Sequence, residues 1–396
     1  MTLAHTHQPI LRNRVTWLAY FMLAYIAISQ SILGPLMPFL RSELELNYTL
    51  GGLLPAAIAI GLIFSGLLSD WLVRRLSRRI VFWGGSIGLV LSVVMFAQGH
   101  NFESIFIAAL GMGFASSLTQ VMIQALLSDQ HGERRAIAFT EANVAASLST
   151  TITPLIIGGM PLLGLDWRLI PVLPFAILAF LGMIFHREAI PESIGAQTES
   201  GIGRAPLPFS FWLYWTVLFL VVAVEMAIVV WATDFLANVT GLGRTKAALA
   251  FGAFPAAMLI GRFLGSCLTQ RWPSQILLPT ALGVTLIGFP IFWLARTPTL
   301  NILGLFIAGL GIANLYPLTL SVAVGLAPDQ SNLASARASL AVGTALLGVP
   351  LFLGWLSDQI GIRIAYGIVI VFTILAFVIV INNHLLLKKS TSSFVR

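Results

Sequence analysis

One stretch decides the fold of this chain: Gly66-Leu67-Leu68-Ser69-Asp70-Trp71-Leu72-Val73-Arg74-Arg75-Leu76-Ser77-Arg78-Arg79. It joins two long apolar runs and places a carboxylate and four arginines directly beyond the first of them. An apolar run of about 20 residues is long enough to cross a bilayer as a helix. Arginines gather in the cytoplasmic loops of membrane proteins. The stretch therefore predicts a short cytoplasmic connection between two membrane-spanning helices, with Gly66 allowing another helix to approach closely.

The composition excludes an ordinary soluble protein. Of the 396 residues, 58% are hydrophobic and only 9% are charged, whereas soluble proteins contain about 25% charged residues. The net charge of +7 comes from arginines in short loops, so membrane topology explains it and no nucleic-acid partner is expected. A single cysteine, and histidines confined to chain ends and loops, predict no metal site and no cofactor. Common nucleotide-binding and hydrolase motifs are absent from the sequence, which favours a protein that is not an enzyme.

Apolar runs of membrane-spanning length occur throughout the chain. They predict an all-α polytopic membrane protein with twelve transmembrane helices, at about residues 15–39, 49–72, 79–98, 103–127, 136–161, 167–186, 208–236, 246–269, 275–295, 301–326, 333–356 and 363–385.

The placement of basic residues predicts the topology. With the N-terminus in the cytoplasm, 15 of the 22 lysines and arginines fall on the cytoplasmic side. The opposite side then has only Arg41, Arg168, Arg244, Lys246, Arg296 and Arg363. We expect both termini in the cytoplasm, and the short loops are typical of a bacterial inner-membrane protein.

The chain divides at residues 187–207, which are polar, rich in Gly, Ser and Pro, and typical of a linker. Residues 1–186 and 208–396 then each hold six spans. The halves also repeat each other, since Pro154 and Pro350 are each followed four residues later by a glycine. Internal repeats of this size occur in transporters whose solute binds between two related halves.

The spacing Gly66-x-x-x-Asp70-x-x-x-Arg74-Arg75 resembles the signature between the second and third helices of the major facilitator superfamily, although the family's second glycine has no counterpart. The resemblance covers about residues 15–385. It implies two pseudo-symmetric six-helix bundles and a transporter that works by alternating access on a small-molecule solute. It also implies that spans 1, 4, 7 and 10 line a central cavity.

Glu225 lies in the middle of span 7, where a charged residue costs about 2.5–3.5 kcal/mol on insertion scales. A carboxyl group removed from water favours its neutral form, as a proton carrier requires. Glu225 therefore predicts proton coupling, with Asp234 as the second candidate. It could equally bind a cationic solute group, or be a protonated side chain bonded to a neighbouring helix.

Two ion pairs are expected to close the cytoplasmic side. The resemblance places span 5 opposite span 8 and span 2 opposite span 11, which predicts the pairs Glu141–Arg262 and Asp70–Arg337. By the repeat spacing, Arg337 occupies the position equivalent to Glu141. Two simpler interpretations stay open. Glu141 and Arg262 could each extend separately to the membrane surface, and Asp70 could only organise its own loop through Arg74, Arg75 or Arg134.

Uncharged polar and aromatic residues near mid-span predict the solute site. They fall mostly in the spans that the resemblance assigns to the cavity: Tyr25, Gln30, Gln120, Gln124, Asn143, Trp231, Asn314 and Tyr316. Each could instead make an ordinary interhelical hydrogen bond, worth about 0.6 kcal/mol on average.

The sequence thus predicts a monomeric, proton-coupled secondary transporter of a small organic solute. A uniporter, or an exporter of amphiphiles or drugs not coupled through Glu225, is the alternative within transport. A membrane receptor or enzyme is the alternative from another class.

Overall fold

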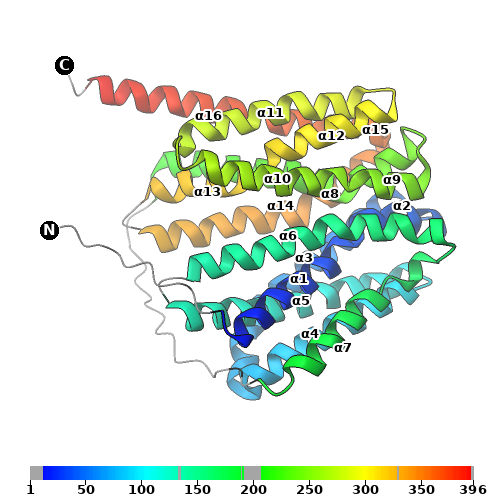
Figure 1. Ribbon diagram of the computed structural model, residues 1–396. Coiled ribbons are helices and arrows are strands. Elements are labelled where there is room, and N and C mark those ends of the chain that lie inside the picture. The colour runs from blue at the N-terminus through cyan, green and yellow to red at the C-terminus, as the bar shows by residue number, and fades with distance from the viewer. Residues whose placement is uncertain (1–11, 133–134, 189, 191–206, 328–329, 394–396) are drawn as a thin grey trace.

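The structure is a computed structural model that describes residues 12–132, 135–188, 190, 207–327 and 330–393 (Figure 1). Over these residues the chain forms helices and no strands. These helices form twelve spans that are long and apolar enough to cross a membrane, as predicted. Most of the predicted linker, residues 191–206, lies outside the described residues.

The first half contains six spans, the first of which is broken at Ile32 into α1 and α2. Its helices are α1 (Arg14–Ser31), α2 (Leu33–Glu43), α3 (Tyr48–Leu76), α4 (Arg78–Gln98), α5 (Phe102–His131), α6 (Arg135–Gly159) and α7 (Val172–Phe185), with short 3-10 turns at Met160–Leu163 and Trp167–Leu169.

The second half also contains six spans, and three of them are again broken into two helices. Its helices are α8 (Phe209–Asn238), α9 (Gly243–Phe251), α10 (Ala253–Leu268), α11 (Ser274–Leu294), α12 (Pro298–Ile312), α13 (Leu315–Gly325), α14 (Ser331–Ile360), α15 (Ile362–Ala365) and α16 (Ile368–Ser393).

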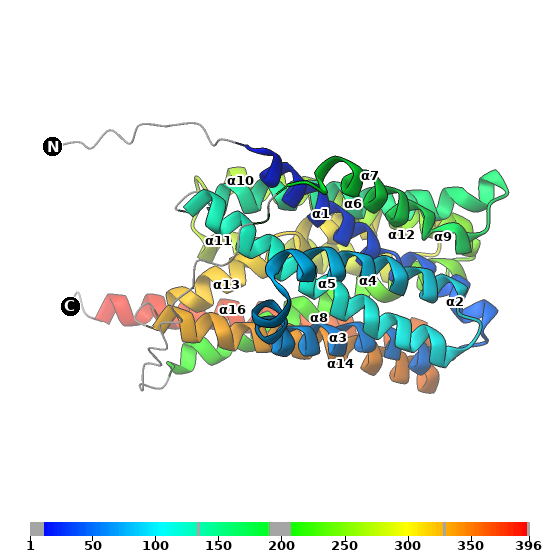
Figure 2. The same cartoon turned by 90° about the horizontal axis from the view of Figure 1, so that it is seen from below.

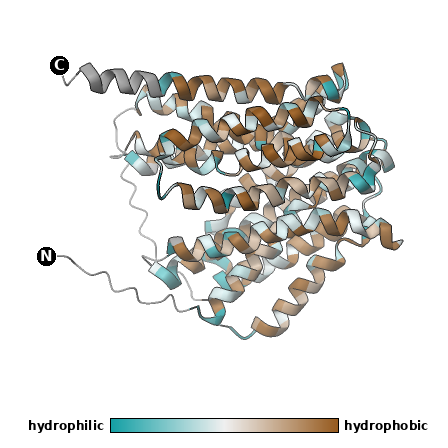
Figure 3. Cartoon of the chain, turned by 45° about the horizontal axis from the view of Figure 1, so that its top comes forward, coloured by the Kyte–Doolittle hydropathy of each residue, from teal (hydrophilic) through white to brown (hydrophobic). Residues whose placement is uncertain are grey.

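The spans run side by side, so that α1 begins and α16 ends at the same end of the molecule (Figure 1). We call this end the terminal end and the other the far end. Large apolar side chains such as Leu67, Met183 and Phe263 are at least 70% exposed. Brown, hydrophobic ribbon dominates the helices in Figure 3. An exposed apolar surface of this extent requires lipid around it.

The signature stretch is more helical than expected. The sequence predicted that the second span ends near residue 72, but α3 continues to Leu76 and α4 begins at Arg78. Asp70, Arg74 and Arg75 therefore lie on the last turns of α3 and not in a loop, because no glycine or proline interrupts the helix there. Ser77 alone makes the connection, with a φ of 72°.

The two halves meet through glycines in the predicted repeat. A Cβ atom added at Gly158 of α6 would lie 2.7 Å from the backbone nitrogen of Leu249 in α9. One added at Gly354 of α14 would lie 2.3 Å from the carbonyl oxygen of Tyr48 in α3. Figures 1 and 2 both show α3 beside α14. Each glycine thus allows one half to touch the other's backbone at the far end.

Candidate functional site

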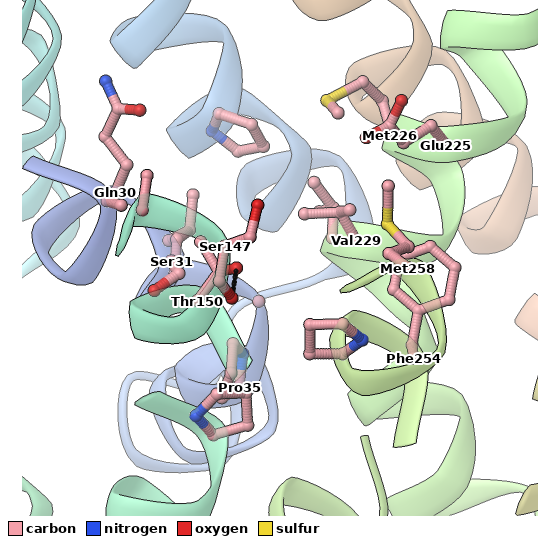
Figure 4. A pocket seen from close by; sticks show the side chains of 18 of the residues that line it. Gln30, Ser31, Pro35, Ser147, Thr150, Glu225, Met226, Val229, Phe254 and Met258 are labelled. Atoms are coloured by element: carbon pink, nitrogen blue, oxygen red, sulfur yellow. Dashed lines mark hydrogen bonds between the residues drawn. The ribbon is translucent and has the colours of Figure 1, made fainter. Parts of the chain in front are cut away.

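A cavity of about 380 Å³ lies between the two halves. Six spans line this central cavity: α1–α2, α3 and α6 from the first half, and α8, α9–α10 and α14 from the second. Figure 4 shows polar side chains on the side of the first half, labelled Gln30, Ser31, Ser147 and Thr150. The opposite side holds carboxylate, thioether and aromatic side chains, labelled Glu225, Met226, Phe254 and Met258.

The polar wall comes mainly from one face of α6. Asn143, Ser147 and Thr150 are spaced by four and three residues, which places them on the same side of a helix. Asn143 donates to the carbonyl of Phe139 at 2.8 Å, and Thr150 donates to the carbonyl of Ser147 at 2.9 Å. The same spacing is visible in the sequence, where it could have identified Ser147 and Thr150.

Glu225 and Arg262 are the only ionisable side chains among the described residues that line the cavity. Glu225 lies near the midpoint of α8, and no hydrogen bond or ion pair reaches its carboxylate from the described part of the chain. Arg262 of α10 donates from Nη1 to the Ser147 hydroxyl at 2.8 Å, across the interface between the halves. The cavity therefore holds one acid and one base, and neither is neutralised by a direct ion pair.

Only some of the predicted solute residues line this cavity. Gln30, Asn143 and Glu225 do, and the Gln30 amide donates to Ser116 Oγ at 3.0 Å. The lining includes no residue of α5 or of α12–α13, which are spans 4 and 10. Spans 1 and 7 line the cavity as the resemblance implies, whereas spans 4 and 10 do not line it in this structure. With the halves in contact at the far end, residues of spans 2, 5, 8 and 11 line the cavity as well.

The remaining predicted solute residues lie outside this cavity, and several bond to backbone. The Tyr25 hydroxyl donates to the Ser86 carbonyl at 2.7 Å, the Trp231 indole to Pro350 at 3.2 Å and the Asn314 amide to Gly261 at 2.6 Å. The others are the half-buried Gln120 and the exposed Gln124 and Tyr316. The three backbone bonds are the interhelical contacts that the sequence analysis left as the simpler interpretation.

Asp234 also lies away from the central cavity. Its carboxylate is fully buried near the far end, and Nη1 of Arg41 donates to its two oxygens at 2.9 and 2.8 Å. The Arg41 guanidinium lies 3.3 Å from the centre of the Tyr48 ring. Since α2 and α8 belong to different halves, this ion pair joins them at the far end.

A second polar contact at the far end involves Asp358 of α14. Its carboxylate accepts hydrogen bonds from the backbone nitrogens of Tyr48 and Thr49, both at 2.8 Å. These are the first two residues of α3, so the second half caps a helix of the first half. Sequence reasoning missed Arg41 and Asp358, because their partners lie 193 and about 310 residues away in the chain.

The expected ion pairs at the terminal end are not formed in this structure. Glu141 is bonded to Arg12 at 2.6 Å and to the Tyr20 hydroxyl at 2.8 Å. Asp70 and Arg337 are exposed, and no ion pair joins them among the described residues. Arg75 lies over the Trp71 ring at 5.3 Å. Arg74 is exposed as well, and Arg134 lies outside the described residues. The pairs were predicted for a closed terminal end, whereas here the far end is closed, so they stay predictions for the other state.

No group of three or more His, Cys, Asp or Glu side chains within the described ranges is arranged to hold a metal ion.

Comparisons with known proteins agree with this geometry. The family model described as "Major Facilitator Superfamily" matches residues 19–336 and 232–391. A glucose/galactose transporter of Brucella abortus is 25% identical over 381 residues, which cover 88% of each chain.

Two solved structures show the same fold. A nucleoside transporter, NupG, has a TM-score of 0.76 at 14% identity, covering 92% of this chain and 99% of its own. A bacterial homolog of the human lysosomal transporter Spinster, in an inward-facing and occupied conformation, has a TM-score of 0.76 at 16% identity. That match covers 94% of this chain and 97% of the homolog.

Proposed function

The chain belongs to the major facilitator superfamily, so it is a membrane transporter and not an enzyme, and on this premise we propose that it is a proton-coupled secondary transporter of a small organic solute. The solute binds in the central cavity and crosses by alternating access. The observation that carries the proposal is the unpaired carboxyl group of Glu225, at mid-membrane depth, in the wall of that cavity.

The distribution of contacts supports alternating access. The far end is closed by Arg41–Asp234 and by the Asp358 cap of α3, whereas the Arg262 side chain is exposed in the cavity. We assign the terminal end to the cytoplasm of a bacterium, with both termini there, because the basic residues favour it. The conformation is then inward-facing, in a monomer built of residues 1–186, a linker at 187–207, and residues 208–396.

The position of Glu225 supports proton coupling. A carboxyl group in a cavity that opens alternately to the two sides can take up a proton on one side and release it on the other. Arg262 is the other ionisable side chain in the described cavity wall, so a charge on Glu225 would act directly on it.

Glu225→Gln should abolish accumulation driven by a pH gradient while retaining solute exchange, because glutamine keeps the shape and loses the proton. A thermal-shift screen of purified protein first selects a solute, beginning with hexoses and nucleosides because the similar proteins are named for them. Uptake into proteoliposomes is then measured with and without a pH gradient.

Glu103→Gln is the matched control, since this exposed carboxylate at the start of α5 lies outside the cavity. Accumulation that remains pH-dependent in Glu225→Gln would contradict the coupling role. If the transport of a solute changes neither with the pH gradient nor in Glu225→Gln, the protein is a uniporter.

A further inference from the structure

We propose that the solute is a small organic monoanion, whose carboxylate binds the guanidinium of Arg262 and whose apolar body lies against Met226, Phe254 and Met258. This inference rests on the proposed function, because it names the chemical class that the same cavity accepts.

The first argument is the charge of the cavity. Arg262 is the only cation in the described lining, and no carboxylate lies within 4.0 Å of it. Its one hydrogen bond to a described residue goes to a neutral hydroxyl, that of Ser147. Charged groups at membrane depth are normally paired or face an aqueous path used by the solute. The missing counter-ion of Arg262 is therefore best supplied by the solute.

The second argument is geometric. A guanidinium presents several N–H donors in a planar fork that matches the two oxygens of a carboxylate. Ser147 occupies one of these donors at 2.8 Å and so fixes the orientation of the group. Thr150 and Asn143 lie on the same face of α6, where they supply further polar atoms beside the bound anion.

The third argument is the rest of the wall. Met226, Val229, Phe254, Met258 and Leu259 form an apolar surface on α8 and α10. A volume of about 380 Å³ is at the lower end of the range for small-molecule sites, about 300–1,000 Å³. A second anionic group on the solute would find no cation in the lining, so the site favours one charge on a compact, partly apolar molecule.

The charges also predict the direction of coupling. With Glu225 protonated, Arg262 is the only charge in the wall, and binding of a monoanion makes the loaded cavity neutral. With Glu225 ionised, the carboxylates of protein and solute compete for one guanidinium. The proton and the anion therefore bind together, which is symport, and a neutral cavity lowers the cost of excluding water as the carrier closes.

Other ionisable groups near Glu225 do not disturb this balance. Among the described elements packed against α8, the phenol of Tyr316 in α13 interacts electrostatically with Glu225, and the phenol of Tyr366, which follows α15, donates to the Ala227 carbonyl at 3.0 Å. Phenols are neutral near pH 7. Arg41 of α2 is paired with Asp234, nine residues or about 13 Å further along α8.

The test measures binding of matched probes to the full-length protein at pH 5.5 and pH 7.5. Benzoate and hexanoate are compared with benzamide, hexanamide and hexylamine by thermal shift. The carboxylates should stabilise the wild-type protein, more strongly at the lower pH, and the amides and the amine should not. Arg262→Gln should weaken carboxylate binding by at least about tenfold, and Arg262→Lys should weaken it less.

Arg271→Gln is the control, since it removes an exposed guanidinium just beyond α10 and should leave binding unchanged. Equal binding of amides, no binding of either carboxylate at millimolar concentration, or full binding by Arg262→Gln would each overturn the inference. Uptake separates this failure from that of the proposed function. Proton-driven accumulation of a neutral solute would contradict only the proposal that the solute is an anion. Carboxylate binding without proton-driven uptake would contradict only the proposal of proton coupling.

Discussion

At the scale of the residue, Ser77 has an unusual backbone conformation. It joins α3 to α4 with φ 72° and ψ 149°, a conformation that suits glycine and crowds a Cβ atom. Its hydroxyl caps α4 only weakly, accepting from the Ile80 nitrogen at 3.5 Å. A residue other than glycine is strained in this conformation, so the connection between α3 and α4 costs the fold some stability.

Ser77→Gly should therefore stabilise the protein by about 1 kcal/mol, because relief of strain exceeds the few tenths lost from the cap. For a chain of this length we expect the melting temperature in detergent to rise by about 1–2 °C.

Ser69→Gly is the control. It lies inside α3, where glycine costs about 1 kcal/mol, and it should lower the melting temperature. An equal fall for both variants would show that Ser77 is not strained.

At the scale of the element, the N-terminus of α3 is capped by a side chain of α14, which belongs to the other half. Asp358 accepts the backbone N–H groups of Tyr48 and Thr49 only while α14 lies against α3. The cap thus strengthens the contact between halves at the far end, in addition to stabilising a helix terminus.

Asp358→Asn should shift the protein towards the state that is open at the far end. The lost charge destabilises the closed state by about 1 kcal/mol, since the carboxylate is exposed, and so raises the open population about fivefold. The readout is labelling of a cavity cysteine, Ala146→Cys in a Cys267→Ser background, by an impermeant maleimide added at the far end.

Asp166→Asn provides the comparison, because the Asp166 carboxylate accepts from the Arg168 nitrogen, within the same half, and from no other group in the described part of the chain. Labelling that rises as much in this variant as in Asp358→Asn would rule out a specific role for the cap.

The elements were largely predictable, but the orientation of their faces was not. Apolar length gives the twelve spans, because each must cross the same bilayer. Glu225 and Arg262 were predictable as well, since charge inside a span is conspicuous in any sequence. Gln124 and Asn314 do not line the cavity in this structure, because rotation of a helix about its axis depends on packing against partners distant in sequence.

At the scale of the whole molecule, the two halves close on each other through a repeated small residue. Gly158 and Gly354 occupy equivalent places in the repeat, and each touches the backbone of the opposite half. The sequence repeat predicted this symmetry, but only the structure shows that its glycines form the interface.

Gly354→Leu should prevent closure of the far end, because even its Cβ would overlap Tyr48. Gly158→Leu should have the same effect against Leu249. Both should raise far-end labelling of the cavity cysteine and abolish uptake while leaving the protein folded in detergent.

Gly182→Leu is the matched control, since no atom lies within 4 Å of a Cβ added there. Normal uptake by either interface variant would contradict closure through these glycines.

The cap on α3 has a consequence for hydration. When the halves separate at the far end, the N–H groups of Tyr48 and Thr49 lose the Asp358 carboxylate and need other acceptors, because the Asn47 side chain caps the Leu50 nitrogen instead. Water that enters the gap can supply these acceptors, so hydration of the far end accompanies its opening. The opening rate should then fall in solutions of low water activity, and it should respond to osmotic stress even when no solute is bound.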